Sequence, residues 1–228
     1  MKSVGIVIPC YNEGKSLNAL IEKCGSSFHP RIKYLLVNNG STDNTKEILA
    51  QQKLPQNVEI LHIRENKGYG FGILQGLKCL EDDFVGWTHA DLQSDPSDIL
   101  KFISCIDSGA DFMKGTRVGR PLSDRFFTGG MSLLISMLFL KRLHDINAQP
   151  TILRKSMLNY WQSPPDDYAL DLYAYLIAVR LNSRIQRKQV TFGPRNWGSS
   201  HWNNGFLARM RFIRRTLKFA LRMRLNLI

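Results

Sequence analysis

The segment Val85–Pro96, VGWTHADLQSDP, is the most informative part of the sequence for the fold. The apolar run FVGW, starting at Phe84, stops abruptly at HADLQ, which is the pattern of a buried parallel strand followed by polar residues where it leaves the sheet. Open α/β sheets bind ligands outside the carboxyl ends of their strands, so His89, Asp91 and Gln93, on alternate positions, are expected to project into a cleft. Such ligands suit Mg²⁺ or Mn²⁺ and a phosphate-bearing substrate. The alternative is an Asp-Pro turn without a ligand.

The chain before this stretch repeats strand, turn and helix three times. Strands are predicted over residues 4–9, 33–37 and 58–63, and the helices that follow them end near Cys24, Gln52 and Leu80. This alternation is typical of a doubly wound α/β domain, in which the polar strand ends face one edge. Because neither GxGxxG after the first strand nor GxxxxGK[ST] is present, a dinucleotide-binding domain and a P-loop are disfavoured.

The second half predicts further elements of the same domain. Strands are expected over residues 110–117, 151–154 and 189–192, and a helix over 171–181. The run 126–143 is apolar on nearly all sides and predicts a buried core helix or a helix in the membrane interface.

Composition indicates one globular core. At 228 residues, with 43% hydrophobic and 22% charged residues, the chain is long enough to bury one. The four cysteines show no CxxC spacing, so we expect free thiols in a reducing compartment rather than disulfides or a zinc site. No signal peptide is expected, because a strand pattern begins at Val4. The longest apolar run, 131–140, is too short to cross a bilayer.

Positive charge is concentrated at the C-terminal end. The net charge is +12, from 31 basic and 19 acidic residues, and no acidic residue follows Asp171. Over 206–228 a helix would have a basic face and an apolar face. The apolar face consists of Phe206, Met210, Ile213, Leu217, Ala220 and Leu221. This pattern is typical of a helix lying on an anionic membrane. The alternatives are a helix packed on the domain with its basic face in water, and nucleic-acid binding, for which no RRM, KH or helix-turn-helix signature is present.

Four motifs carry a family resemblance: IVIPCYNEG at 6–14, VNNGSTDNT at 37–45, ENKGYGFG at 65–72 and HADLQSDP at 89–96. In this order and spacing they resemble the family 2 glycosyltransferases of the GT-A fold, and over about residues 3–200 the chain is most similar to the dolichol- or polyprenyl-phosphate sugar transferase group. The resemblance implies an α/β fold with a doubly wound, mixed, mainly parallel sheet flanked by helices. We expect this domain over residues 1–203 and the basic amphipathic helix over 204–228.

The resemblance also implies a nucleotide-sugar site. Asn38 and Asn39 stand where the family usually has an acidic pair that holds the base and ribose. Amides offer donors and acceptors but no negative charge, so the identity of the base stays open. The residues that the resemblance assigns to this site are Pro9, Tyr11, Asn12, Glu13, Asn38, Asn39, Lys67, Gly68, His89, Ala90 and Asp91.

For the metal, the resemblance implies Mg²⁺ or Mn²⁺ on Asp91, the last residue of a DxD motif, and on Gln93. His89 departs from the family, which usually has Asp there. A neutral His can ligate Mn²⁺ or only hydrogen-bond a phosphate. Fewer carboxylates make the pocket less negative, so the cation is expected to be held more weakly, and an inactive binder is a further alternative.

An acceptor-phosphate site is implied in the second half. Arg suits it because a planar guanidinium binds phosphate through two hydrogen bonds, whereas Arg120 is expected to be a solvated surface charge. Residues 193–202 resemble the family's mobile R-x-x-G-x-S loop, which closes over the donor. The residues assigned to the acceptor phosphate are Arg117, Ser123, Arg125, Arg195 and His201, and those assigned to catalysis are Asp91, Asp171, Arg117 and Arg195.

Asp171 has two competing roles. A sugar-hydroxyl acceptor must lose its proton in an inverting displacement, and Asp171 is the first choice of base. A phosphate acceptor is already a nucleophile, so Asp171 would then position the donor sugar or an arginine. Helix N-capping is the structural alternative.

The resemblance therefore predicts a metal-dependent inverting glycosyltransferase that moves a sugar from a nucleotide-sugar to a polyprenyl phosphate at the cytoplasmic face of the membrane, with which it associates peripherally. The second reading is transfer to a sugar hydroxyl of a lipid-linked glycan in polysaccharide assembly, and the third is a non-catalytic membrane- or nucleic-acid-binding protein. The expected partners are the donor, a lipid-linked acceptor and an anionic membrane surface, without nucleic acid. A membrane partner protein is left open.

Overall fold

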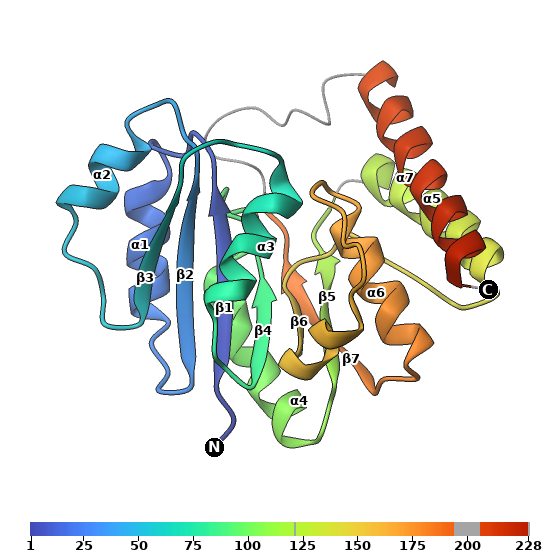
Figure 1. Cartoon of the computed structure of the whole chain (residues 1–228), viewed down its shortest axis with the longest axis horizontal. Coiled ribbons are helices and arrows are strands. Elements are labelled where there is room, and N and C mark those ends of the chain that lie inside the picture. The colour runs from blue at the N-terminus through green and yellow to red at the C-terminus, as the bar shows by residue number, and fades with distance from the viewer. Residues whose placement is uncertain (121, 194–205, 228) are drawn as a thin grey trace.

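The structure is a computed structural model that describes residues 1–120, 122–193 and 206–227 (Figure 1). A seven-stranded sheet runs through its centre in the order β3-β2-β1-β4-β6-β5-β7. The strands are β1 (Val4–Cys10), β2 (Ile32–Asn39), β3 (Val58–Ile63), β4 (Phe84–Trp87), β5 (Phe112–Val118), β6 (Thr151–Arg154) and β7 (Ile185–Thr191).

The sheet is mainly parallel, as the sequence predicted. Strand β6 pairs antiparallel with both β4 and β5, and the other strand pairs are parallel. The carboxyl ends of β1, β2 and β4 therefore meet at one edge, and the loops that follow them lie side by side. The predicted strands at the amino-terminal end are confirmed to within a few residues.

Helices cover both faces of the sheet (Figure 1). One core layer contains side chains of α1 (Leu17–Ser26), α2 (Thr45–Gln51), the 3₁₀ helix η1 (Pro96–Phe102) and α4 (Ile103–Asp107). The other contains side chains of α3 (Tyr69–Cys79), α5 (Leu122–Phe139), α6 (Leu170–Arg180) and α7 (Phe206–Leu227), and a further 3₁₀ helix, η2 (Lys155–Tyr160), follows β6. Side chains alternate along β1, where Ile6 and Ile8 enter the first layer and Val7 the second.

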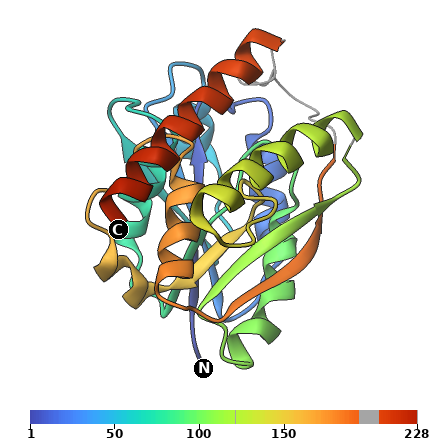
Figure 2. The ribbon, with the colours of Figure 1, turned by 90° about the vertical axis from the view of Figure 1, so that its right-hand side faces the viewer.

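The C-terminal helix α7 lies beside α5 on the outside of the second layer (Figure 2). Ala220 and Met223 are buried in this layer, and Leu217 packs against it. Met210 and Leu221, predicted on the same apolar face, are 44% and 53% exposed. Much of the apolar face of α7 therefore packs against the domain, whereas Arg214 and Lys218 are exposed. No helix in the described ranges has both the length and the apolar character needed to cross a bilayer.

Candidate active site

A cleft opens where β4 ends, with a polar floor and an apolar wall. Its volume is about 110 Å³, or about 930 Å³ when all the space open to solvent is counted. The segment after β4 and the end of β5 supply polar side chains, His89, Asp91, Gln93 and Arg117, which we call the floor. Helices α5 and α7 supply apolar side chains, Phe127, Met131, Phe212 and Ile213, which we call the wall. The lining residues are His89, Asp91, Gln93, Arg117, Phe127, Thr128, Met131, Asn147, Tyr168, Asp171, Phe192, Phe212 and Ile213.

The three polar residues predicted from the stretch after β4 all line this cleft. Asp91 Oδ1 accepts a hydrogen bond from the Gln93 backbone N–H at 3.1 Å, across Leu92 with φ 57°. Gln93 Nε2 donates to the Gly193 carbonyl at 3.1 Å, and Gly193 N donates back to the Gln93 carbonyl at 2.8 Å. These bonds fix the segment against the chain that follows β7.

A metal ion fits this floor only as part of a larger complex. Within the ranges that the structure describes, no three His, Cys, Asp or Glu side chains gather as a metal site. Asp91 offers a carboxylate and Gln93 an amide oxygen. Mg²⁺ characteristically takes one or two protein oxygens and completes its shell with water and phosphate. The donor set therefore suits a cation that arrives with a diphosphate.

His89 lies beside an aromatic pair. The centroid of its ring is 5.8 Å from that of Tyr69. The Tyr69 ring in turn stacks on the Tyr168 ring, with 4.7 Å between their centroids. Burial lowers the pKa of His89 below its ordinary value, with help from Arg117 and against the pull of Asp91. The imidazole is therefore neutral at pH 7, the form that can ligate a metal or accept a hydrogen bond.

Asp171 is a buried carboxylate at the inner end of the cleft, and its side chain is 4% exposed. Its Oδ1 accepts hydrogen bonds from Gln149 Nε2 at 2.8 Å, Trp87 Nε1 at 3.2 Å and Thr151 Oγ1 at 3.2 Å. Lys114 Nζ, fully buried, lies 3.3 Å from the same oxygen and 2.6 Å from Thr151 Oγ1. Among the described residues, no donor bonds Oδ2. Asp171 is thus held by one oxygen while it lines the cleft.

The helix-capping alternative for Asp171 is wrong. Helix α6 begins at Leu170, and its N-cap residue is Ala169. Asp171 lies in the first turn, but its carboxylate turns toward β4, β5 and β6, because a buried Lys114 in the middle of β5 needs an opposite charge.

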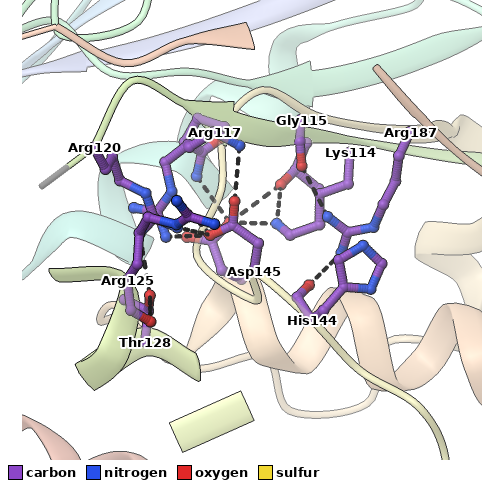
Figure 3. Close-up of polar contacts among 12 residues, drawn as sticks. Lys114, Gly115, Arg117, Arg120, Arg125, Thr128, His144, Asp145 and Arg187 are labelled. Carbon is purple, nitrogen blue, oxygen red and sulfur yellow. Dashed lines mark hydrogen bonds and ion pairs between the residues drawn. The ribbon is translucent and has the colours of Figure 1, made fainter. Parts of the chain in front are cut away.

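Arg117, at the end of β5, is locked to Asp145 (Figure 3). Its backbone N–H donates to Oδ2 at 2.8 Å, and its Nε donates to Oδ1 at 3.0 Å, with Nη2 on the same oxygen. The Arg117 guanidinium also lies over the Phe192 ring at 5.3 Å. Burial works to raise the pKa of Asp145, but Arg117, aided by Arg120, outweighs it, and the pKa lies below its ordinary value.

The expectation for Arg120 is wrong. Its side chain is only 8% exposed, because the chain turns at Gly119, with φ 83°, and carries Arg120 back toward Asp145 at 3.3 Å. Arg125 is exposed and lines a second hollow with Arg117 and Arg120. The side chain of Ser123 lies outside the described part of the structure, as do Arg195 and His201.

The residues predicted for the nucleotide form a second group. Asn12 Oδ1 accepts from the Thr42 backbone N–H at 2.8 Å, which joins the loops after β1 and β2. Asn38 Oδ1 accepts from the Ser41 N–H at 3.1 Å, and Asn39 Nδ2 donates to the Gly68 carbonyl at 2.9 Å. Both asparagines are buried. Their amides therefore tie the strand-end loops together.

The remaining members of this group differ in exposure. Tyr11 is 41% exposed, Pro9 and Glu13 are partly buried, and the Lys67 side chain is 56% exposed beside Glu65. Ala90, in contrast, is 4% exposed and packs in the first core layer, so its side chain does not line the cleft. Gly68 has φ 127°, and a Cβ there would lie 2.4 Å from the Asp166 carbonyl oxygen, which explains the glycine.

The polar groups of residues 145–150 were expected to face the sugar-binding side, but the pairings that hold Asp171 and Arg117 were not predicted from the sequence. Lys114 and Gln149 hold Asp171, and Asp145 holds Arg117. A lysine inside the apolar strand pattern of β5 was the one available signal, because a buried ammonium needs a partner.

The family-level comparison matches residues 5–158 to Glycosyl transferase family 2, which is more than half of the chain. The chain belongs to glycosyl transferase family 2. In this glycosyltransferase the matched region extends from β1 to η2 and includes the segment with His89 and Asp91.

Solved structures show the same fold. Glucosyl-3-phosphoglycerate synthase from Mycobacterium tuberculosis, in complex with Mn²⁺, UDP and glucosyl-3-phosphoglycerate, matches with a TM-score of 0.75 and 14% identity, over 98% of this chain and 80% of that one. The same enzyme with Mg²⁺ and UDP matches with a TM-score of 0.69 and 15% identity, over 98% and 79%. S. aureus TarS 1–349 with UDP-GlcNAc matches with a TM-score of 0.62 and 20% identity, over 94% and 66%. The glycosyltransferase therefore has the GT-A architecture that the resemblance implied.

Proposed function

We propose that this glycosyltransferase moves a sugar, with inversion, from a nucleoside-diphosphate sugar to a polyprenyl phosphate. The observation that carries the proposal is the two-sided cleft: Asp91 and Arg117 on its floor, and Phe127, Met131 and Phe212 on its wall. A polar floor suits phosphate groups, and an apolar wall suits a hydrocarbon chain attached to one of them. An acceptor with both properties fits this cleft better than a purely polar sugar.

On the donor side, similar structures bind UDP together with Mn²⁺ or Mg²⁺. In this chain Asp91 and the Gln93 amide oxygen would hold the cation, with neutral His89 as a further ligand or a phosphate contact. When bound there, such a cation would neutralise charge on the leaving diphosphate. Asn12, Asn38 and Asn39 keep the loops at the ends of β1 and β2 in place for the nucleoside.

A phosphate acceptor needs no base, because its oxygen is already ionised and nucleophilic. Arg117 would bind this phosphate and orient one oxygen toward the anomeric carbon. Asp171, fixed through Oδ1 by four donors, would then position the donor sugar through Oδ2.

Transfer to a sugar hydroxyl of a lipid-linked glycan is the second candidate. One observation favours it: Asp171 reaches the cleft, and no described donor bonds its Oδ2, so this oxygen is placed to take a proton. The two candidates separate at Asp171→Asn, which keeps much of the activity with a phosphate acceptor and loses most with a hydroxyl acceptor.

The proposal includes peripheral attachment to the cytoplasmic face of an anionic membrane. On α5, Phe126, Leu133 and Met137 are 83%, 61% and 56% exposed, and on α7 basic side chains are exposed beside Leu221 and the 80% exposed Leu225. Exposed apolar groups flanked by positive charge suit an anionic bilayer surface. The four unpaired cysteines suit a reducing compartment. A membrane partner protein is compatible with the same surface.

The test is transfer of labelled sugar from a panel of nucleotide-sugars to a synthetic polyprenyl phosphate, with the matching polyprenol as the control acceptor. The proposal expects a labelled product from the phosphate and none from the alcohol, and the product should be labile to mild acid. Transfer to a lipid-linked glycan alone would favour the second candidate.

A further inference from the structure

The geometry around Arg117 points to Asp145 as a positioning residue for the acceptor site. We propose that Asp145 binds one edge of the Arg117 guanidinium and also holds Arg120 in place. The opposite edge of Arg117 then faces the cleft and binds the acceptor's phosphate. This inference rests on the proposed function, because it concerns how the acceptor's anionic group is held.

The bonds leave one side of Arg117 for a ligand. A guanidinium has a side edge, Nε with one Nη, and an end edge, the two Nη groups, and either can hold an anion through two parallel hydrogen bonds. Asp145 takes the side edge through Nε and Nη2 (Figure 3). Among the described residues, no acceptor bonds Nη1. Arg117 lines both the cleft and the second hollow, so it stands in the wall between them.

The loop that carries Asp145 is itself braced. Asp145 has a left-handed backbone conformation, with φ 42°, which non-glycine residues adopt infrequently. Arg187 on β7 donates to the carbonyl of the preceding residue, His144, at 2.6 Å and to the Gly115 carbonyl at 2.8 Å. Its guanidinium lies over the Tyr175 ring at 5.2 Å. This bracing places the carboxylate at a fixed point opposite Arg117, as preorganised sites require.

The local charge balance attracts an anion. Arg117, Arg120 and Arg125 line the second hollow with one acidic residue, Asp145, so the group keeps a positive excess after Asp145 is paired. Arg120 is held by Asp145 and by Thr128 Oγ1, at 3.3 Å and 3.2 Å. One carboxylate holds the buried guanidiniums of Arg117 and Arg120 in place. A phosphate that enters the cleft therefore meets Arg117 without prior side-chain ordering.

The matched variants are Asp145→Asn and Asp111→Asn in the full-length protein. Asn keeps the shape and one acceptor oxygen but removes the charge that orients Arg117. Asp111 is the control because it likewise accepts from a guanidinium, Arg154 Nε at 3.1 Å, and from a backbone N–H, that of Arg184, at 3.1 Å, and it does not line the cleft. The probes are farnesyl phosphate, farnesol and UDP, with binding measured by calorimetry and folding by thermal unfolding.

We expect Asp145→Asn to weaken farnesyl phosphate binding by about tenfold, the scale of one charge-assisted contact. Binding of UDP and of farnesol should be unchanged, and Asp111→Asn should alter neither ligand. Unchanged or tighter binding of farnesyl phosphate by Asp145→Asn would overturn the inference. Equal weakening of UDP binding would also overturn it, because Asp145 would then have a general structural role.

Failure of the proposed function would look different. If the wild-type protein does not bind farnesyl phosphate, the polyprenyl-phosphate acceptor is wrong. Inorganic phosphate then becomes the probe for anion binding at Arg117. Weaker phosphate binding by Asp145→Asn alone would still support the positioning role. Equal binding by both variants, or none by the wild type, would overturn it.

Discussion

The buried pair of Asp171 and Lys114 makes a pH-dependent contribution to stability that one substitution can expose. The two groups are 3.3 Å apart, and their side chains are 4% and 0% exposed. Burial lowers the pKa of Lys114 from 10.5 to about 8, although Asp171 opposes the shift. Between pH 8 and 10.5 the unfolded chain therefore binds more protons at this group than the folded one, so the free energy of unfolding rises with pH there.

Asp171→Asn keeps an acceptor oxygen for Gln149 and Thr151 but removes the charge beside Lys114. A stranded buried charge would cost about 3–5 kcal/mol. Lys114 avoids most of this cost by releasing its proton. The pKa of Lys114 in the wild type is about 8. Because pH 7 is one unit below this pKa, removing the proton from Lys114 costs only about 1 kcal/mol. The pH-dependent part of the penalty should therefore be about 1 kcal/mol at pH 7 and disappear above pH 8.

The assay is urea unfolding of the wild type and Asp171→Asn, followed by circular dichroism at pH 6, 7 and 9. The difference in free energy of unfolding between the two proteins should shrink as the pH rises, because below pH 8 the folded wild type binds one proton more than the folded variant. A difference that stays constant from pH 6 to 9, or that grows with pH, would show that Lys114 does not release its proton in the variant.

Three further predictions concern the ion pair, the apolar wall and the basic helix. Lys114→Met strands the Asp171 carboxylate and should lower the free energy of unfolding by about 3–5 kcal/mol in urea, whereas a loss below 1 kcal/mol would contradict the buried pair. Phe212→Ala removes part of the apolar wall and should weaken farnesyl phosphate binding by about fivefold while UDP binding is unchanged; equal effects on both would contradict a lipid role for the wall. Replacing Lys218 and Arg222 by Glu should weaken binding to vesicles that contain anionic lipid, on the order of 1 kcal/mol per charge, and sedimentation that is the same as for the wild type would argue against membrane attachment through α7.

The sequence predicted the parts of the molecule that depend on local pattern. The apolar run ending at HADLQ located β4 and placed His89, Asp91 and Gln93 in one cleft, and the Val58–Ile63 and Thr151–Arg154 strands have the predicted bounds. Short apolar runs and polar strand ends are signals contained within a few residues. The helices η1 and α4 were not predicted, because the segment 96–107 is short and mixes polar with apolar residues.

The residue pairings that the sequence did not predict depend on contacts across the sheet. Asp145 meets Arg117 across 28 positions of sequence, and Asp171 meets Lys114 across 57. Neither pairing has a spacing signal, because β6 inserts antiparallel between β4 and β5 and so sets which side chains converge. Helix α7 has the expected amphipathic pattern, yet its pattern alone did not decide between the domain and a membrane, and the structure packs Ala220 and Met223 against the core.

The most direct test of sugar transfer is release of nucleotide and movement of label into lipid, measured with a nucleotide-sugar panel, Mn²⁺ or Mg²⁺ and membrane extract. Wild-type protein, Asp91→Ala and Asp107→Ala are compared, the last being an exposed carboxylate that pairs with Arg31 outside the cleft. We expect turnover of one donor into the lipid fraction by the wild type and Asp107→Ala, and loss of this turnover in Asp91→Ala without a change in thermal unfolding. Equal turnover by wild type and Asp91→Ala, or no nucleotide binding and no turnover with any donor, would contradict this expectation.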